Sequence, residues 1–243
     1  IILDGKKLSE KILNNLKKEI KSRRLELKLA VVLVGNNLAS RIYVRKKELA
    51  CKKIGVDFKL YRFDSRIGTH RLKEEVKRIV KDPEIFGIVI QLPLPKNIDS
   101  GKILNIVPGK KDIDVLSKNS FEKFAKGKSP VLPPTVAAVS YFFRDYKIKL
   151  RGKYVVIVGA GRLVGKPLAA WLRLRKANFS ILDKNTEDLS YFTQKADILI
   201  TGVGKPNLIK ANMVKKGTIV IDVGGDVDFK PVSRKAAYIT PTV

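Results

Sequence analysis

The sequence predicts an α/β protein of two domains, each built around a parallel sheet. Short runs rich in valine and isoleucine alternate with segments whose apolar residues recur at helical spacing. Strands that alternate with helices are typical of βαβ units, and therefore of parallel, doubly wound sheets. A loop rich in proline and glycine interrupts this alternation near the middle of the chain. We therefore predict one domain over residues 1–138 and a second over residues 139–243.

The N-terminal domain is predicted to repeat a cycle of helix and strand. Its first element is an amphipathic helix over residues 9 to about 23, with Ser9 as a candidate cap. The next is a valine-rich strand at 29–34, which ends at a Gly-Asn-Asn turn. The remaining elements are a helix at about 40–54, a strand at 56–61, a helix at about 70–81, a strand at 86–92 and a helix at about 100–106.

After the interrupting loop, the same alternation predicts the second domain. An apolar segment at 136–143 is typical of a helix that leads into this domain. The elements that follow are a strand at 154–158, a helix at about 164–175 and strands at 179–182, 198–201 and 218–223. No repeat of fixed period and no low-complexity tract is present in the chain.

Composition limits the class of protein. The chain has 243 residues, of which 44% are hydrophobic and 30% charged, as in a folded globular protein. No apolar run reaches the length of a membrane span, and the first residues lack a signal-peptide pattern, so we expect a cytoplasmic protein. Cys51 and His70 are the only residues of their kinds, so a zinc site of Cys and His ligands is excluded, and nothing else requires a metal.

The formal net charge is +27, from 50 Lys and Arg residues against 23 Asp and Glu residues. Such an excess attracts polyanions, whether nucleic acid, acidic membrane surfaces or small molecules rich in phosphate and carboxylate. The basic residues are spread along the chain, however, which is also typical of a lysine-rich solvated surface. Charge alone therefore does not select a partner.

A glycine-rich turn after the strand at 154–158 predicts a dinucleotide site. The first glycine permits a tight turn, the second lets the backbone approach a pyrophosphate, and the following helix directs its N-terminus at that anion. The third glycine stands one position later than in the commonest spacing, and a purely structural turn remains the alternative. The candidate cofactor-binding residues are Gly159, Ala160, Gly161, Arg162, Leu163, Val164 and Gly165.

The residues after the next strand bear on which dinucleotide binds. Asp183 follows Gly159 by 24 residues, where an acidic side chain can hydrogen-bond the ribose 2′-hydroxyl of NAD. Lys184 beside it and Arg162 in the turn can instead hold the 2′-phosphate of NADP. An aspartate at a strand end is also an ordinary turn residue. These residues alone leave the choice between NAD and NADP open.

Seven segments resemble the methylenetetrahydrofolate dehydrogenase/cyclohydrolase family and occur in that family's order. They are residues 34–47 (VGNNLASRIYVRKK, similar to V-G-x-x-x-A-S-x-x-Y-V-x-x-K), 91–95 (QLPLP), 111–114 (KDID), 164–167 (VGKP), 196–199 (ADIL), 221–224 (IDVG) and 225–229 (GDVDF). The first two are the most specific, and together the segments span nearly the whole chain. The resemblance implies a folate-binding catalytic domain followed by a Rossmann-type NAD(P)-binding domain, with a cleft between them.

The resemblance also implies roles for single residues. Lys47 is the implied catalytic base or proton shuttle, and Gln91 supports it by hydrogen bonding. Tyr43 lies four residues before Lys47, so both share one face of the helix, where a partly desolvated lysine can exchange protons. Tyr43 also positions the folate, and Asp114 binds its pterin ring. The further candidates for substrate binding are Ser40, Leu92 and Pro93.

The implied reactions are oxidation of 5,10-methylenetetrahydrofolate by hydride transfer to the nicotinamide, and hydrolysis of the methenyl product to 10-formyltetrahydrofolate. The implied substrates are tetrahydrofolates, which can carry several glutamates, and the implied assembly is a homodimer. Two alternatives remain, a monofunctional NAD-dependent dehydrogenase and a basic nucleic-acid-binding protein on a Rossmann scaffold. Only 7% of the residues are aromatic and no RNP-like motif is present, so we expect no nucleic-acid partner.

The sequence departs from the family pattern at several positions. Ala160 stands where the family has the arginine of G-R-S, and residues 183–186, which end at Thr186, read DKNT in place of H-S-x-T. The resemblance implies NADP as the cofactor, with NAD as the alternative, and both changes weaken the NADP assignment. Val115 stands where a glycine follows the K-D-V-D segment. The sequence stops at residue 243, where the family continues into a glycine-rich loop and a last helix, so we expect further residues in the full protein that return to the first domain.

Overall fold

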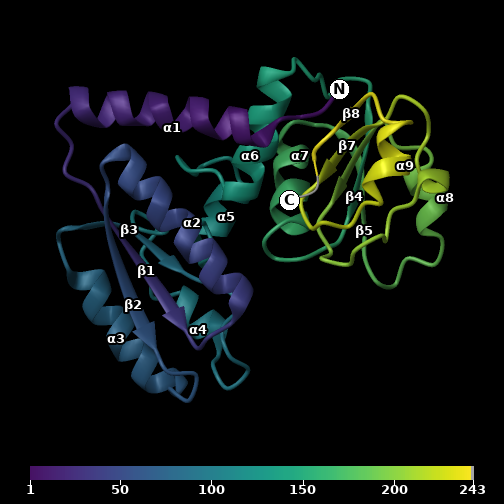
Figure 1. The fold of residues 1–243 in the computed structure, drawn as a ribbon. Helices are drawn as coiled ribbons and strands as arrows, with labels where there is room; N and C mark the ends of the chain where they lie inside the picture. The colour runs from purple at the N-terminus through teal and green to yellow at the C-terminus, as the bar shows by residue number, and fades with distance from the viewer. Residues whose placement is uncertain (242–243) are drawn as a thin grey trace. The chain divides into compact units, whose positions relative to one another are not determined.

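A computed structural model describes residues 1–241 and divides the chain into two compact units, both with a parallel sheet and flanking helices (Figure 1). The N-terminal unit comprises residues 8–124 and 129–131. The C-terminal unit comprises residues 1–7, residues 125–128 and the described chain from Leu132 onward. The α/β class with parallel sheets is therefore confirmed.

The N-terminal unit is a three-stranded parallel sheet in the order β2-β1-β3. Its strands are β1 (Lys28–Val34), β2 (Asp57–Phe63) and β3 (Ile85–Ile90). Its helices are α1 (Gly5–Ser22, whose first residues belong to the other unit), α2 (Leu38–Ile54), α3 (Thr69–Lys81), α4 (Ser100–Leu104) and α5 (Lys118–Ala125). Since β1 is flanked by β2 on one side and β3 on the other, the chain reverses its winding direction between β1 and β3. Ligands of open α/β sheets bind at the carboxyl ends of such a pair.

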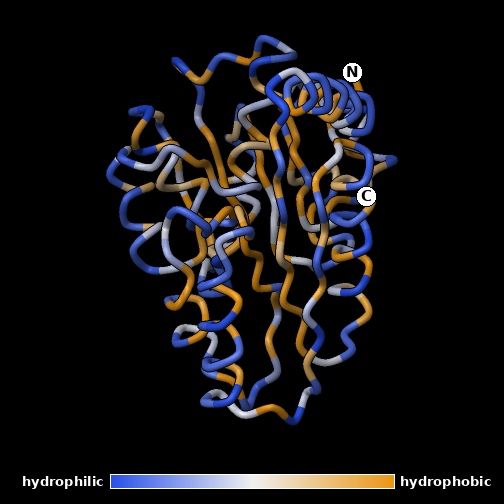
Figure 2. Tube along the Cα trace, turned by 90° about the vertical axis from the view of Figure 1, so that its left-hand side faces the viewer, coloured by the Kyte–Doolittle hydropathy of each residue, from blue (hydrophilic) through white to orange (hydrophobic). Residues whose placement is uncertain are grey.

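Apolar side chains on both faces of this sheet form its core. Alternate residues of β1 point to opposite faces, and all five residues 30–34 are buried. On one side α3 contributes Leu72, Val76 and Ile79, whose spacing places them on a single stripe. Figure 2 shows hydrophobic stretches in the strands and alternating hydrophobic and hydrophilic turns in the helices. Each buried side chain of this size stabilises the fold by about 1.5–3 kcal/mol.

The C-terminal unit is a five-stranded parallel sheet in the order β5-β4-β6-β7-β8. Its strands are β4 (Tyr154–Val158), β5 (Asn178–Leu182), β6 (Ile198–Thr201), β7 (Ile219–Asp222) and β8 (Tyr238–Ile239). Its helices are α6 (Pro134–Asp145), α7 (Gly165–Leu174), α8 (Leu189–Thr193), the 3-10 helix η1 (Ala211–Met213) and α9 (Phe229–Ser233). The winding reverses between β4 and β6, so this pair marks the expected ligand edge of the second sheet.

The first residues of the chain extend the second sheet. Ile2 forms a parallel bridge with Ile239, and the backbone N–H of Leu3 donates to the carbonyl of Ile239 at 2.8 Å. Leu3 is fully buried. The chain therefore begins in the C-terminal unit, crosses to the N-terminal unit along α1 and later returns.

Several predicted elements differ from the structure. The first helix begins at Gly5, because the carboxylate of Asp4 accepts the N–H of Lys7 at 2.9 Å and so caps it; Ser9 lies inside the helix. Strand β3 ends at Ile90, not at residue 92, because the prolines that follow cannot donate to the ladder. The elements α5, α8, η1, α9 and β8 were not predicted. All of them except α5 have five residues or fewer, a length at which periodicity is rarely decisive.

Two features are absent from the described residues. None of the helices within residues 1–241 has both the length and the apolar character needed to cross a membrane. Within the same range, no three His, Cys, Asp or Glu side chains are grouped as metal ligands would be.

Candidate active site and dinucleotide-binding site

Helix α2 carries the candidate catalytic lysine at the carboxyl end of β1. Asn37 caps the helix, since its side-chain oxygen accepts the N–H of Ser40 at 3.0 Å. Tyr43 and Lys47 follow on one face, with Nζ of Lys47 5.9 Å from the centre of the Tyr43 ring. Lys47 is partly buried, whereas Tyr43 is 53% exposed. Because the Tyr43 ring is exposed, it offers aromatic surface to a ligand beside the ammonium of Lys47.

Gln91 meets Lys47 from the neighbouring strand. Its backbone N–H donates to the carbonyl of Val32 at 2.9 Å, which places it one residue past the end of β3 and beside β1. Nζ of Lys47 donates to Oε1 of Gln91 at 3.1 Å, and Nε2 of Gln91 donates to the carbonyl of Leu92 at 2.9 Å. The second bond fixes the amide so that its oxygen faces the ammonium. Lys47 and Gln91 thus lie at the point where the winding of the sheet reverses.

The carbonyl of Leu92 joins this loop to the start of α2. It accepts the hydroxyl of Ser40 at 3.3 Å as well as the amide of Gln91. Ser40 is 2% exposed, so its hydroxyl serves this internal contact. The peptide bond between Leu92 and Pro93 is cis. Of the candidate substrate-binding residues, Ser40 and Leu92 are therefore bonded to each other, and Leu92 is also bonded to the side chain of Gln91.

Asp114 lies on a segment held against β3. The N–H of Ile88 donates to the carbonyl of Lys111 at 2.8 Å, and the carboxylate of Asp112 accepts the N–H groups of Leu116 and Ser117 at 3.1 and 2.9 Å. These contacts fix the turn that presents Asp114.

The electrostatic surroundings of Asp114 connect it with Lys47. Burial raises the pKa of the Asp114 carboxyl, the ammonium of Lys47 lowers it, and the nearby charge of Asp112 raises it. Burial has the largest effect. Asp114 is thus near enough to Lys47 for their charges to interact. A partly buried carboxylate of this kind suits the N–H donors of a heterocyclic ring.

Val115 shows what the departure from glycine does to this turn. It has a φ of +56°, in the left-handed region that disfavours a β-branched side chain. Its side chain is only 3% exposed, so burial offsets the strained backbone. The family's glycine at this position would adopt the same conformation without strain.

The glycine-rich turn follows β4 in the C-terminal unit. Gly159 has a φ of +103°, and a Cβ there would lie 2.9 Å from the carbonyl oxygen of Gly202. A Cβ on Gly165, the first residue of α7, would overlap the carbonyl of Gly159. A Cβ on Gly161 would have no heavy atom within 4 Å. Two glycines are therefore required by the fold, whereas the space around Gly161 is open to a ligand.

Two buried aspartates hold the loops beside this turn, and neither was predicted as a site residue. The carboxylate of Asp226 accepts the N–H groups of Val203 and Lys205 at 2.8 and 2.7 Å, which fixes the loop after β6. Asp222 at the end of β7 accepts the hydroxyl of Thr201 at 3.0 Å. It also accepts the N–H groups of residues 225, 226 and 227 at 2.8, 2.9 and 3.0 Å. The sequence signal was two aspartates that bracket a glycine pair directly after a buried strand.

The loop held by Asp226 packs on the glycine-rich turn. A Cβ on Gly202 would overlap the side chain of Val164, and Gly202 already lies close to Gly159. The carboxyl ends of β4, β6 and β7 therefore form one connected layer, in which Asp226 sets the position of a loop that touches the candidate cofactor site.

Asp183 lies one residue past β5 and forms a local turn. Its Oδ1 accepts the N–H of Asn185 at 2.9 Å, and its own N–H donates to the hydroxyl of Thr186 at 3.1 Å. Asp183, Lys184 and Arg162 are all exposed. In the described residues no hydrogen bond or ion pair joins Asp183 to the glycine-rich turn. The pairing of β4 with β5 brings the two loops to one edge, where the N–H of Gly159 donates to the carbonyl of Leu182 at 2.8 Å.

These features define a class of protein. A strand, a glycine-rich turn and a helix at the reversal point of a parallel sheet form a Rossmann-type dinucleotide-binding domain, and the other unit carries a lysine, an amide and a carboxylate that suit proton transfer. This is the organisation of a two-domain NAD(P)-dependent dehydrogenase.

Comparison with known proteins identifies the family. Residues 3–114 match the family model described as the tetrahydrofolate dehydrogenase/cyclohydrolase catalytic domain, and residues 133–243 match the NAD(P)-binding domain of the same family. The chain therefore belongs to the tetrahydrofolate dehydrogenase/cyclohydrolase family, and the resemblance seen in the sequence is confirmed.

Individual relatives agree along the whole chain. The bifunctional protein FolD of Nautilia profundicola is 46% identical over 253 residues, which cover 99% of this chain and 89% of the relative. A crystal structure of the bifunctional FolD enzyme from Campylobacter jejuni is 39% identical, with a TM-score of 0.94 and coverage of 99% and 90%. The FolD structure from Trypanosoma brucei, complexed with NADP and an inhibitor, is 28% identical with the same TM-score and the same coverage.

Proposed function

We propose that this enzyme oxidises 5,10-methylenetetrahydrofolate to the methenyl compound with NADP as the hydride acceptor, and hydrolyses the methenyl compound to 10-formyltetrahydrofolate. The observation that carries the proposal is the hydrogen bond between Lys47 and Gln91 at the winding reversal of the N-terminal unit. The proposal is also supported by the NAD(P)-binding domain, which the family model matches over residues 133–243.

In this proposal Lys47 moves the protons. Its Nζ accepts a proton from the water that adds to the methenyl carbon, and Gln91 keeps Nζ directed at that carbon through the 3.1 Å bond. The exposed ring of Tyr43 stacks on the substrate and holds it over Lys47. Asp114 accepts hydrogen bonds from the pterin ring. Leu92 and Pro93, with Ser40 beneath them, line the substrate side of the same loop.

The C-terminal unit fits a dinucleotide. The open space at Gly161 admits a pyrophosphate, and helix α7 directs its positive end toward it. Residues 159–165 hold that group in the proposal. When bound, the cofactor supplies a nicotinamide ring that accepts the hydride. Arg162 and Lys184 are assigned to the 2′-phosphate of NADP, since Asp183 is engaged in its own turn with Asn185 and Thr186.

The test is to give the purified full-length protein 5,10-methylenetetrahydrofolate with NADP or NAD in parallel, and to follow formation of the reduced nicotinamide. Hydrolysis of the methenyl compound is measured separately in the wild type and in Lys47→Met. Turnover with NADP and loss of hydrolysis in the variant support the proposal. Turnover with NAD alone rejects the NADP assignment. An active dehydrogenase without hydrolysis supports the monofunctional alternative, and no turnover rejects both activities.

Four further expectations from the sequence also remain proposals. We propose a cytoplasmic homodimer that accepts polyglutamylated folates and binds no nucleic acid. Sedimentation equilibrium tests the dimer, because a monomer at micromolar concentration would exclude it. Titration with nonspecific DNA at low salt tests the last point, since binding that weakens with added salt would favour the rival interpretation of the positive charge. The boundary between residues 138 and 139 likewise remains a prediction for the functional domains.

A further inference from the structure

The N-terminal unit has a recess at the carboxyl end of β2, and none of the residues of the Lys47 site lines it. Its volume is about 580 Å³, and its wall includes the guanidinium groups of Arg62, Arg66 and Arg71 together with the apolar side chains of Phe63 and Ile67. All three arginines are exposed, whereas Phe63 and Ile67 are partly buried. The recess therefore combines positive charge with an apolar floor.

Two of the three arginines are not engaged with protein acids. The acidic wall residues are already paired: Asp64 accepts Arg66 at 2.9 and 3.3 Å, and Glu75 accepts Arg78 at 3.1 Å. In residues 1–241 neither Arg62 nor Arg71 has an ion pair or a side-chain hydrogen bond. These two guanidinium groups are available to carboxylates of a ligand, which they bind through paired N–H donors.

The start of helix α3 adds to this positive character. The helix has 13 residues, and its cap residue, Gly68, provides no side-chain acceptor for the first N–H groups. Arg71 lies within the first turn. The N–H groups and the positive end of the helix therefore face the same recess as the arginines.

The recess lies on the same edge of the sheet as the proposed active site. The N–H of Gly35, which begins the loop leading to α2, donates to the carbonyl of Phe63 at 2.9 Å. Asn97, just past the loop that carries Gln91, donates through Nδ2 to the carbonyls of Ser65 and Ile67 at 3.2 and 3.1 Å. The loops after β1, β2 and β3 are thus bonded to one another.

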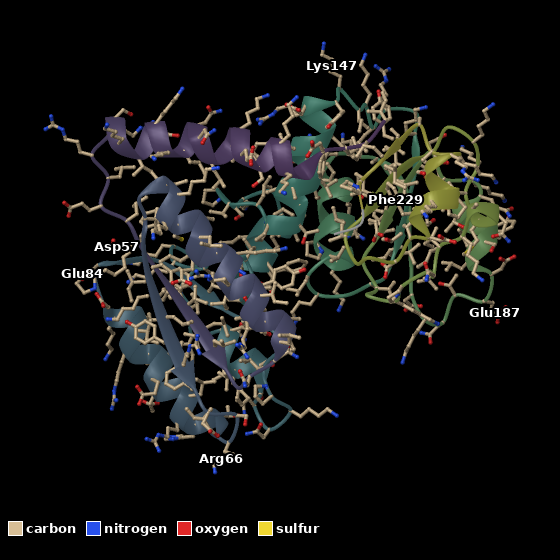
Figure 3. All side chains as sticks on the ribbon, viewed as in Figure 1. Asp57, Arg66, Glu84, Lys147, Glu187 and Phe229 are labelled. Atoms are coloured by element: carbon tan, nitrogen blue, oxygen red, sulfur yellow. The ribbon has the colours of Figure 1, made fainter. Side chains whose placement is uncertain are left out.

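The distance between the two places matches an extended ligand. Gln91 follows β3 and Phe63 ends β2, with β1 between them, so the two strand ends are about 10 Å apart at the usual strand spacing. Figure 3 shows Arg66 beyond the carboxyl ends of the strands, with Asp57 and Glu84 near the amino ends of β2 and β3. A molecule bound at Lys47 and lying along this edge would reach the arginines.

We propose that this recess binds the glutamate tail of a polyglutamylated folate. The inference rests on the proposed function, which places the one-carbon end of the folate at Lys47 and leaves its glutamate end to extend along the edge. Each added γ-linked glutamate brings one α-carboxylate and two methylene groups. The carboxylates bind Arg62, Arg71 and the start of α3, while the methylene groups pack on Phe63 and Ile67.

The experiment compares the KM for 5,10-methylenetetrahydrofolate carrying one or five glutamates. In the wild type we expect KM to fall by about 10-fold with the longer tail, as two exposed arginine contacts would give, with kcat unchanged. In the double variant Arg62→Ala/Arg71→Ala this decrease is lost, while KM for the monoglutamate stays the same. Free γ-linked pentaglutamate competes with the long substrate in the wild type only.

The matched control is Arg23→Ala/Arg24→Ala. Both residues are exposed and precede β1, so they lie at the opposite edge of the same sheet, and their removal changes the net charge by the same amount. The control should keep the 10-fold decrease in KM. The inference is overturned if KM falls equally with the longer tail in the wild type and in Arg62→Ala/Arg71→Ala. It is also overturned if KM in the wild type does not change with tail length. Absence of turnover with the monoglutamate would instead reject the proposed function.

Discussion

The Nζ atom of Lys47 donates a hydrogen bond to Oε1 of Gln91 at 3.1 Å, and this contact joins the helix after β1 to the loop after β3. The partner is a neutral amide, so it orients the amine without adding negative charge. A carboxylate in the same place would hold Lys47 as a fixed ammonium. The choice of amide therefore suits a group that must gain and lose a proton during each turnover.

We predict that Gln91→Glu slows methenyltetrahydrofolate hydrolysis by about 10- to 100-fold at pH 7, because the new carboxylate favours the ammonium form of Lys47 over the free amine. The loss should shrink at alkaline pH, and a pH–rate profile measures this. Gln91→Ala removes the orienting bond without adding charge, so its activity should fall without an alkaline shift. Identical profiles for the two variants would show that Gln91 acts only by orientation.

We predict that Asp114→Asn makes the protein more stable and less active. Burial raises the pKa of the Asp114 carboxyl, so the charged form is disfavoured in the folded state. The stability that protonation provides is lost as the pH rises through this raised pKa. At pH 7 the neutral asparagine should raise the melting temperature by about 2–4 °C, the effect of roughly 1 kcal/mol in a chain of this size.

The pH dependence distinguishes this explanation from a packing effect. Below about pH 3, where the aspartate is largely protonated in the folded and unfolded states alike, the difference in melting temperature should disappear. A constant difference across the pH range would contradict the role of burial. Activity provides the second readout: Asp114→Asn should raise the KM for the folate, because the amide no longer accepts every pterin N–H.

The sequence predicted which side chains share a helical face better than it predicted which strands lie side by side. The spacing of Tyr43 and Lys47 places them on one helical face, as the structure shows. The contact with Gln91 depends on β3 lying beside β1, and alternation of helices and strands gives no strand order. The contact between Lys47 and Gln91 was therefore predicted from the family resemblance and not from periodicity.

The elements and site residues that the sequence did not predict depend on contacts between distant parts of the chain or are too short to show a pattern. Helices α8 and α9 have five residues each, too few to show a helical period, and α8 is fixed by a cap from Asp188 to the N–H of Tyr191 at 2.9 Å. Asp222 and Asp226 act by accepting backbone N–H groups of loops distant in sequence. Such partners become visible only when the loops are placed in space.

We predict that Asp226→Asn weakens binding of the dinucleotide. An asparagine side chain has a single acceptor oxygen, so it cannot accept the N–H groups of both Val203 and Lys205 through two oxygens as the carboxylate does. The loop after β6 would loosen where it touches Gly159. We expect the KM for NADP to rise by about 10-fold, as loss of one charge-assisted hydrogen bond would give, with a smaller effect on kcat.

A general loss of stability would lower the amount of folded enzyme and therefore kcat, while leaving KM unchanged. The two effects are separated by measuring kcat and KM together at a temperature well below the unfolding transition. An unchanged KM for NADP in a folded Asp226→Asn variant would contradict the prediction. The same measurement on Asp228→Asn, which lies at the start of α9 outside the loops held by Asp226, serves as the control.

We predict opposite behaviour for two alanine substitutions in the glycine-rich turn. Gly165→Ala places a methyl group against the carbonyl of Gly159, so the turn must move and the protein should lose several kcal/mol of unfolding free energy. Gly161→Ala meets no heavy atom within 4 Å of the new Cβ, and its melting temperature should stay within about 2 °C of the wild type. Thermal unfolding without any ligand measures both.

The functional half of this prediction is that Gly161→Ala still binds NADP poorly. Its methyl group occupies the space that the pyrophosphate requires, so stabilisation of the protein by added NADP should be lost although the protein itself is intact. The measurement is the shift in melting temperature with increasing NADP. A Gly161→Ala variant that unfolds like the wild type and is stabilised equally by NADP would show that the pyrophosphate does not approach the chain at Gly161.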